Sequence, residues 1–211
     1  MSSLPEAKFD AAFRALPLVA ILRGVKPNEV EAIALSLYEE GFRIIEVPLN
    51  SPQAFDSIAR LARCLPADAV MGAGTVLSTG AADKVRDAGG QLVVMPHADT
   101  RVVSHVKAQG LLCVPGAATP TEAFACVEAG ADAVKLFPAE LVTPQVVKAM
   151  RAVLPATLKL LPVGGITPET MGAFRAAGAA GFGLGGALYA PGFSAGDVAQ
   201  RARAFVTAWR A

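Results

Sequence analysis

Short apolar runs alternate with amphipathic stretches along almost the whole chain. Each run is four to six residues long, is rich in small and branched aliphatic residues and is followed by turn residues, which is typical of strands covered on both faces. The sequence contains eight such runs, namely Leu18–Leu22, Ile44–Leu49, Val70–Ala73, Leu92–Met95, Leu111–Val114, Ala133–Phe137, Leu158–Val163 and Gly181–Leu184. We therefore expect eight short, buried strands separated by helices.

Helix signals fill the intervals between these runs. Residues 28–40 place apolar side chains at helical spacing, and Gly41 follows as a stop. A capping residue directly before a proline marks four further helix starts, at Ser51, Thr119, Thr143 and Thr167, and Glu122 completes a capping box with Thr119. We also expect a first helix over about Pro5–Ala15 and a last helix over about Ser194–Trp209.

The repeated strand–helix unit predicts the fold class. Eight βα units in 211 residues indicate an α/β protein with a (β/α)8 TIM barrel, one domain over residues 1–211, with an extra N-terminal helix. The alternative is a doubly wound open sheet, which usually has fewer strands and a glycine fingerprint after the first strand. The first run here ends in Leu22-Arg23-Gly24 without that fingerprint.

Composition and charge exclude several classes of protein. Hydrophobic residues make up 53% of the chain, which is enough to build a large core and excludes disorder. The 19 Lys and Arg residues nearly balance the 18 Asp and Glu residues, and no basic stripe is present, so we expect no nucleic-acid partner. Residues 176–196 are uncharged over the length of a membrane span, but their seven glycines favour a strand and a turn, so we expect no membrane association.

The cysteines and the N-terminal residues indicate a cytoplasmic protein. Cys64, Cys113 and Cys126 are odd in number, widely spaced and outside any CxxC motif, so we expect reduced thiols rather than disulfides or a zinc site. Charged residues are frequent among the first fourteen positions, which argues against a secretory signal peptide.

Charged residues interrupt three of the predicted strands, and two of them are candidates for a functional site. Glu46 lies in the second run and Lys135 in the sixth, and alternate strands of a barrel contribute to the same interior layers. We expect both side chains to point inward near the carboxyl ends of the strands, either as a buried ion pair or as an amine nucleophile beside a carboxylate. Lys159 also interrupts an apolar run, but it precedes Val163 by four residues, so we expect it at the opposite end, in contact with solvent.

A lysine inside a barrel can act as a nucleophile. Burial lowers the pKa of an amine, and a neutral amine can attack a ketone to form a Schiff base. The protonated imine then accepts electrons, which makes retro-aldol cleavage feasible without a metal. Glu46 is the only carboxylate within a predicted strand and is the candidate for moving protons.

Residues after the strands can hold an anionic substrate. Arg23 ends the first run, where a guanidinium suits an anionic group, and Thr75 offers a hydroxyl after the third run. Gly-Gly pairs at 164–165 and 185–186 follow the last two runs, where barrels often bind phosphate through backbone N–H groups; the alternative is ordinary turn glycine.

Other motifs carry less weight. Residues 181–186 match GxGxxG, but no room remains for the following βαβ unit, so we reject a nicotinamide cofactor. His97 follows the fourth run and could lie at the mouth, whereas His105 lies in a helical stretch and is expected at the surface. Two histidines without suitably spaced carboxylates do not predict a metal site.

Several blocks of the sequence together resemble one known family. The blocks are Ala20–Gly24, Ile45–Pro52, Gly72–Leu77, Val114–Gly116, Ala133–Pro138 and Val163–Glu169. In these blocks, and from Leu16 to Trp209 as a whole, the chain resembles the pyruvate-dependent class I aldolases that cleave 2-keto-3-deoxy-6-phosphosugar acids.

The resemblance implies a function for each candidate residue. Lys135 would form the Schiff base and Glu46 would shuttle protons, while pyruvate and glyceraldehyde 3-phosphate would be the products. Arg23 and Thr75 would hold the carboxylate end, and the phosphate would lie against the backbone of Gly165, Gly185 and Gly186. The resemblance further implies a homotrimer and no metal or organic cofactor.

The family has two branches, whose substrates differ in configuration at C4. Pro48-Leu49-Asn50 and Val163 resemble the galactonate branch, since the gluconate branch typically has Thr-Leu-Arg and Thr at these places. Gly186 departs from the serine that is frequent there, which removes one side-chain donor to phosphate. Cleavage of the gluconate epimer or of both epimers, a metal-dependent lyase and a noncatalytic phosphosugar-binding barrel remain alternatives.

Overall fold

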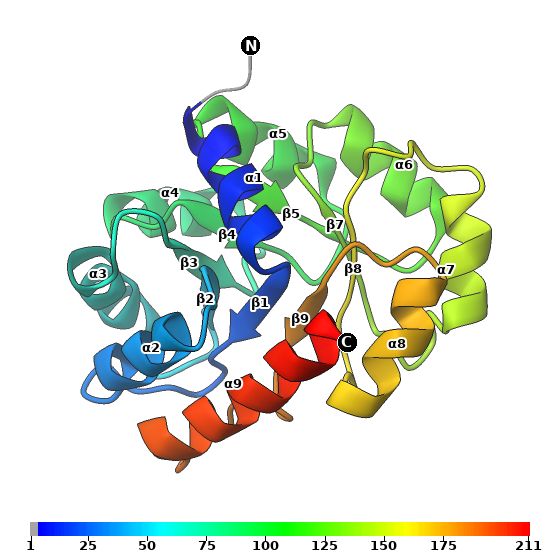
Figure 1. Cartoon of the computed structure of the whole chain (residues 1–211). Helices are drawn as coiled ribbons and strands as arrows, with labels where there is room; N and C mark the ends of the chain where they lie inside the picture. Colours follow the sequence, from blue (N-terminus) through cyan, green and yellow to red (C-terminus); the bar gives the residue numbers. More distant parts are fainter. Residues whose placement is uncertain (1–3) are drawn as a thin grey trace.

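A computed structural model of the chain describes residues 4–211, in which parallel strands surround a common interior and helices cover their outer side (Figure 1). The described strands are β1 (Leu18–Ile21), β2 (Ile44–Pro48), β3 (Val70–Gly74), β4 (Leu92–Val94), β5 (Leu112–Val114), β6 (Gly116–Ala117), β7 (Val134–Leu136), β8 (Leu160–Pro162) and β9 (Phe182–Leu184). The described helices are α1 (Leu4–Ala15), α2 (Val30–Glu39), α3 (Ala54–Cys64), α4 (Thr79–Asp87), α5 (Thr100–Ala108), α6 (Pro120–Glu128), α7 (Pro144–Arg151), α8 (Pro168–Ala176) and α9 (Ala195–Arg210). The predicted α/β class is confirmed, and every predicted apolar run overlaps a strand.

The strands form two parallel sheets, ordered β5-β4-β3-β2-β1-β9 and β6-β7-β8. Pro115 separates β5 from β6, because a proline has no N–H to donate to a neighbouring strand. Its carbonyl still accepts a hydrogen bond from the Lys135 N–H at 2.9 Å. At the other junction, Val163 forms a parallel bridge with Gly183. The short strand β6 was not predicted from the sequence.

Alternate strand residues point to two different sides. Those facing the interior form a compact buried cluster, and those facing outward form a larger cluster with the helices. The interior cluster contains Val19, Ile44, Val70, Leu92, Val94, Leu112, Val114, Ala133 and Leu161, together with Phe9 and Ala12 of α1. Because the side-chain period of a strand is two, Glu46 follows Ile44 onto the interior face and Lys135 follows Ala133.

Helix α1 lies across the amino ends of the strands (Figure 1). Phe9 is 1% exposed and packs into the interior cluster. Lys159, immediately before β8, forms an ion pair with Asp10 at 2.8 Å and is 25% exposed. Lys159 therefore lies away from the carboxyl ends of the strands, as expected, but it is tied to α1 rather than freely solvated.

The helix starts follow the predicted capping residues in most places. Thr119 and Glu122 form the capping box of α6, and α7 and α8 begin at the prolines that follow Thr143 and Thr167. The prediction for Ser51 was wrong, because α3 begins at Ala54. The Ser51 hydroxyl instead accepts a hydrogen bond from the N–H of Gly24, at 2.9 Å.

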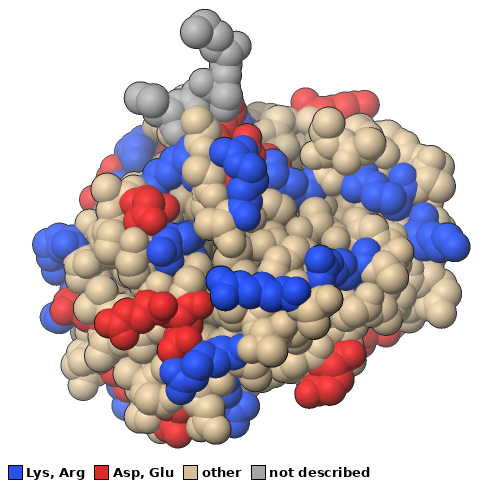
Figure 2. Space-filling view, viewed as in Figure 1, with Lys and Arg blue, Asp and Glu red and all other residues tan. Residues whose placement is uncertain are grey.

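The uncharged run 176–196 contains the end of α8, the strand β9 and the loop before α9. Within the described residues, no helix combines the length and the apolarity that a membrane crossing requires. On the face drawn in Figure 2, Lys and Arg side chains are interspersed with Asp and Glu.

Candidate active site

Glu46 and Lys135 line one cavity inside the ring of strands, as their positions in the predicted strands suggested. Glu46 lies on β2 and is 1% exposed, and Lys135 lies on β7 and is 5% exposed. The remaining lining side chains are apolar apart from the backbone of one glycine: Phe9, Val19, Ile21, Leu92, Val94, Val114, Leu161, Val163 and Gly183. The two ionisable groups are therefore largely removed from water.

Burial shifts the two groups toward their neutral forms. The pKa of Glu46 is raised mainly because burial disfavours the carboxylate, against the opposing charges of Lys135 and Arg23. The pKa of Lys135 is lowered mainly by burial and further by Arg23, while Glu46 acts in the opposite direction. Within residues 4–211, no hydrogen bond or ion pair reaches the Glu46 Oε2 atom. The arrangement thus differs from the buried ion pair that was the alternative reading of these two residues.

Phe137 was not identified from the sequence as a site residue. The Lys135 Nζ atom lies 4.8 Å from the centroid of its ring, within the range of a cation–π interaction. The sequence held the signal, because Lys135 and Phe137 are two positions apart in the predicted run Ala133–Phe137, and strand alternation places such side chains on the same side. An aromatic face at this place can stabilise positive charge on the Lys135 nitrogen.

Above the inner cavity, a solvent-open cleft of about 320 Å3 shares Lys135 with it. Such a volume lies within the range of small-molecule sites, about 300–1,000 Å3. The cleft brings together the predicted residues Arg23, Lys135, Gly165, Gly185 and Gly186. Thr75, at the end of β3, lines neither the cleft nor the inner cavity.

The glycines that line the cleft differ in backbone conformation and in the space around them. Gly164 and Gly165 have φ values of 118° and 60°, a region that favours glycine, so this turn exposes its backbone through a conformation other residues rarely adopt. Around Gly185 and Gly186 a side chain would meet open space. Their absence of a side chain therefore leaves the upper cleft wide and its backbone accessible.

Arg23 is held by the loop that follows β2. Its Nη1 donates to the Asn50 Oδ1 at 2.8 Å, next to the hydrogen bond between the Gly24 N–H and the Ser51 hydroxyl. Ser51 is buried, whereas Arg23 and Asn50 are exposed. Two consecutive residues after β2 thus orient two consecutive residues after β1, a contact between distant segments that the sequence did not reveal.

Thr75 has a φ of 57°, in the left-handed region that β-branched residues rarely occupy. Strain of this kind costs about 1–3 kcal/mol and is concentrated at functional sites. Thr75 is half-buried beside the last residue of β3. Its conformation marks this turn as specialised, although its hydroxyl is not part of the cleft wall.

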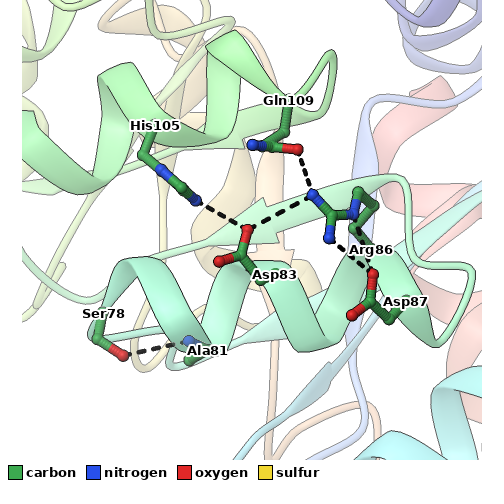
Figure 3. A network of polar contacts seen from close by, with 7 residues as sticks. All are labelled: Ser78, Ala81, Asp83, Arg86, Asp87, His105 and Gln109. Carbon is green, nitrogen blue, oxygen red and sulfur yellow. Dashed lines mark hydrogen bonds and ion pairs between the residues drawn. The ribbon is translucent and has the colours of Figure 1, made fainter.

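The two histidines lie apart from the cleft. His97 is exposed after β4, and the His105 Nε2 lies 2.9 Å from the Asp83 Oδ1. Figure 3 shows this contact between α4 and α5, where Arg86 also joins Asp83 to the neighbouring polar residues. In the part of the chain that the structure describes, no group of three or more potential metal ligands is found.

The chain is similar in sequence and in fold to known aldolases. The family model of KDPG and KHG aldolases matches residues 9–202. The 2-dehydro-3-deoxy-6-phosphogalactonate aldolase of Escherichia coli (strain K12) is 44% identical over 195 residues, covering 92% of this chain and 95% of that protein. The 2-dehydro-3-deoxy-phosphogluconate aldolase of Treponema pallidum (strain Nichols) is 34% identical over 167 residues, covering 78% and 79%.

A solved structure of native KDPGal aligns with a TM-score of 0.91 at 44% identity, covering 92% of this chain and 95% of that one. With the family model and these relatives, this match shows that the chain belongs to the KDPG and KHG aldolases, a family of carbon–carbon lyases.

Proposed function

We propose that this aldolase cleaves 2-dehydro-3-deoxy-6-phospho-D-galactonate to pyruvate and D-glyceraldehyde 3-phosphate through a Schiff base on Lys135. The observation that carries the proposal is the pair Glu46 and Lys135 in one cavity, with Lys135 also open to the cleft. A lysine whose pKa is lowered by burial supplies the neutral amine that attacks a ketone.

The reaction begins with attack of the Lys135 amine on the C2 ketone. Glu46 in its acid form donates a proton to the hydroxyl of the resulting carbinolamine, which leaves as water and gives a protonated imine. The imine draws the electrons of the C3–C4 bond as that bond breaks, and the Glu46 carboxylate accepts the proton of the C4 hydroxyl, so the aldehyde leaves as glyceraldehyde 3-phosphate. The enamine then takes this proton at C3 from Glu46. Water hydrolyses the protonated imine to release pyruvate and the free amine, and the proton set free returns to the Glu46 carboxylate.

The substrate is held at both ends of the cleft. Arg23 lines the cleft together with Lys135 and binds the carboxylate of the substrate. The family resemblance adds Thr75 as a second donor, but its position outside the lining of the cleft and of the inner cavity gives that role no support. The backbone of Gly165, Gly185 and Gly186 receives the phosphate, and the open space beside Gly185 and Gly186 leaves room for it. The glycine at 186 supplies no hydroxyl, so we expect weaker phosphate binding than a serine would give.

The galactonate epimer is favoured by sequence similarity. Identity is 44% to the galactonate-type relative and 34% to the gluconate-type relative. Pro48-Leu49-Asn50 and Val163 point in the same direction. Measuring kcat/KM with both C4 epimers tests this assignment, and a preference for the gluconate epimer would reverse it.

We also propose that residues 1–211 form one domain in which the two sheets close into an eight-stranded barrel. Support comes from the shared strand β5–β6 on one side and the Val163–Gly183 bridge on the other. By the family resemblance, the protein works in the cytoplasm as a homotrimer, without metal or organic cofactor. Sedimentation equilibrium tests the oligomeric state, and activity that disappears with a chelator would contradict the metal-free chemistry.

Borohydride trapping tests the central assignment. The protein is reduced in the presence of pyruvate, digested and mapped by mass spectrometry, and the adduct is expected on Lys135. Lys159→Met provides a matched control, because Lys159 also interrupts an apolar run but lies at the opposite end of the strands, paired with Asp10. Trapping that survives Lys135→Met, or binding of the sugar acid without turnover, would refute the proposal.

A further inference from the structure

Gly74 lies directly beneath the carboxyl group of Glu46. A Cβ atom at position 74 would be 1.8 Å from the Glu46 Oε2, 2.5 Å from its Cδ and 2.9 Å from its Oε1. All three distances are shorter than any real contact, so the space that a side chain would need is occupied by the carboxyl group itself.

The backbone conformation does not explain why position 74 is a glycine. Gly74 has no positive φ, unlike Gly164 and Gly165, so its conformation is open to other residues. Gly72 on the same strand has a different reason, since a Cβ there would lie 1.9 Å from the backbone oxygen of Leu92 on β4. The neighbour of Gly74 is instead the far end of a flexible side chain.

The strand register explains why these two residues meet. Glu46 is paired with Gly72, and Pro48 with Gly74, so Gly74 lies one pleat further toward the carboxyl ends on the interior face of β3. The Glu46 side chain leans across to that position. Because its Oε2 has no hydrogen-bond partner in the described residues, packing against Gly74 rather than hydrogen bonding sets its place.

We propose that Gly74 is a positioning residue for Glu46, and that the missing side chain keeps the carboxyl group where it transfers protons to and from the bound substrate. This inference rests on the proposed function, in which Glu46 moves the protons. It assigns a role in catalysis to a residue that carries no functional group.

The substitution Gly74→Ala tests the proposal. The new methyl group displaces the Glu46 carboxyl group and leaves the strand backbone in place, so the protein folds but transfers protons poorly. A displacement on the order of 1 Å can lower a rate by about 10²-fold, and we expect kcat to fall by about that factor with KM changed little. Gly172→Ala is the matched control, because Gly172 is exposed on α8 with open space around it.

Two measurements with pyruvate separate this proposal from the proposed function. Borohydride trapping reports the Schiff base, and exchange of the pyruvate methyl hydrogens in D2O reports proton transfer at C3. Gly74→Ala is expected to retain trapping and to lose exchange, while Gly172→Ala retains both. Wild-type protein that traps no pyruvate refutes the Lys135 chemistry, whereas normal exchange in Gly74→Ala refutes only the role of Gly74.

Combinations with position 46 show whether Gly74 acts through Glu46. In a Glu46→Gln background, Gly74→Ala is expected to cause no further loss, because interacting residues do not contribute additively. In a Glu46→Asp background the shorter side chain vacates the space over position 74, so Gly74→Ala costs less than in the wild type. Additive losses, or failure of Gly74→Ala to fold in both the wild-type and the Glu46→Asp background, would overturn the proposal.

Discussion

Replacing Phe9 by Ala tests whether α1 seals the amino ends of the strands. The ring is 1% exposed, lines the cavity of Glu46 and Lys135, and lies 5.8 Å from the ring of Phe13. Truncating a buried phenylalanine to alanine costs about 3–5 kcal/mol. For a protein of this length, 1 kcal/mol shifts Tm by about 2–4 °C, so we expect a decrease of about 6–20 °C.

The same substitution is expected to change the pH dependence of activity. Water entering from the amino ends finds polar partners in Glu46 and Lys135, so the enlarged cavity hydrates. Burial is the main cause of the lowered pKa of Lys135, and hydration therefore moves this pKa back up. Since the neutral amine is the reactive form, the limb of kcat/KM that rises with pH shifts to higher pH.

Urea unfolding and the pH profile of kcat/KM measure the two effects separately. Phe13→Ala serves as a control, because Phe13 is half-buried on the same helix but does not line the cavity. It is expected to lose less stability and to leave the pH profile in place. A loss below about 1 kcal/mol for Phe9→Ala would refute the packing argument, and an unshifted profile in a strongly destabilised variant would refute the link to Lys135.

Four further substitutions probe the inner cavity, the cleft and the contact that holds Arg23. Glu46→Gln should lower kcat by about 10²–10⁴-fold while pyruvate is still trapped, and near-normal turnover would remove Glu46 from the mechanism. Lys135→Met should unfold at a higher urea concentration than the wild type at pH 7, because the folded wild-type protein, in which the pKa of Lys135 is lowered, disfavours the charged amine. This gain in stability should vanish above about pH 10.4, where the lysine of the wild type is neutral in both the folded and the unfolded state. Asn50→Ala frees Arg23 and should raise KM by about 2–10-fold with little change in kcat, and an unchanged KM would contradict the positioning of Arg23. Gly186→Ser adds a hydroxyl in open space and should lower KM for the phosphorylated substrate by about 10-fold without affecting pyruvate trapping; an equal effect on both would place the phosphate elsewhere.

The residues that the sequence predicted best are those whose chemistry conflicts with their surroundings. A charge within a buried apolar strand is costly, so Glu46 and Lys135 were conspicuous before their positions were known. Alternation along the strands then placed both in the interior, and the structure puts them in one cavity. The glycines after the last two strands were predicted from a different signal, their position at the carboxyl ends of these strands.

Residues whose importance depends on a distant partner were not predicted. Ser51 has a good local pattern for a helix cap, but its hydroxyl is used by the N–H of Gly24, and α3 starts three residues later. Asn50 contacts Arg23 only because β1 and β2 are neighbours. Gly74 looks like any strand glycine until the Glu46 side chain is placed above it.

The cavity raises the pKa of Glu46 and lowers that of Lys135, and both changes suit the reaction proposed above. Attack on the ketone requires an amine without its proton, and departure of water from the carbinolamine requires a group that can donate one. Burial makes Lys135 easier to deprotonate and Glu46 easier to protonate, so the neutral pair comes closer in free energy to the charged pair. The tight apolar lining thus disfavours the charged forms of the two residues that it encloses and, by the same physical effect, favours the protonation states that the proposed Schiff-base mechanism requires.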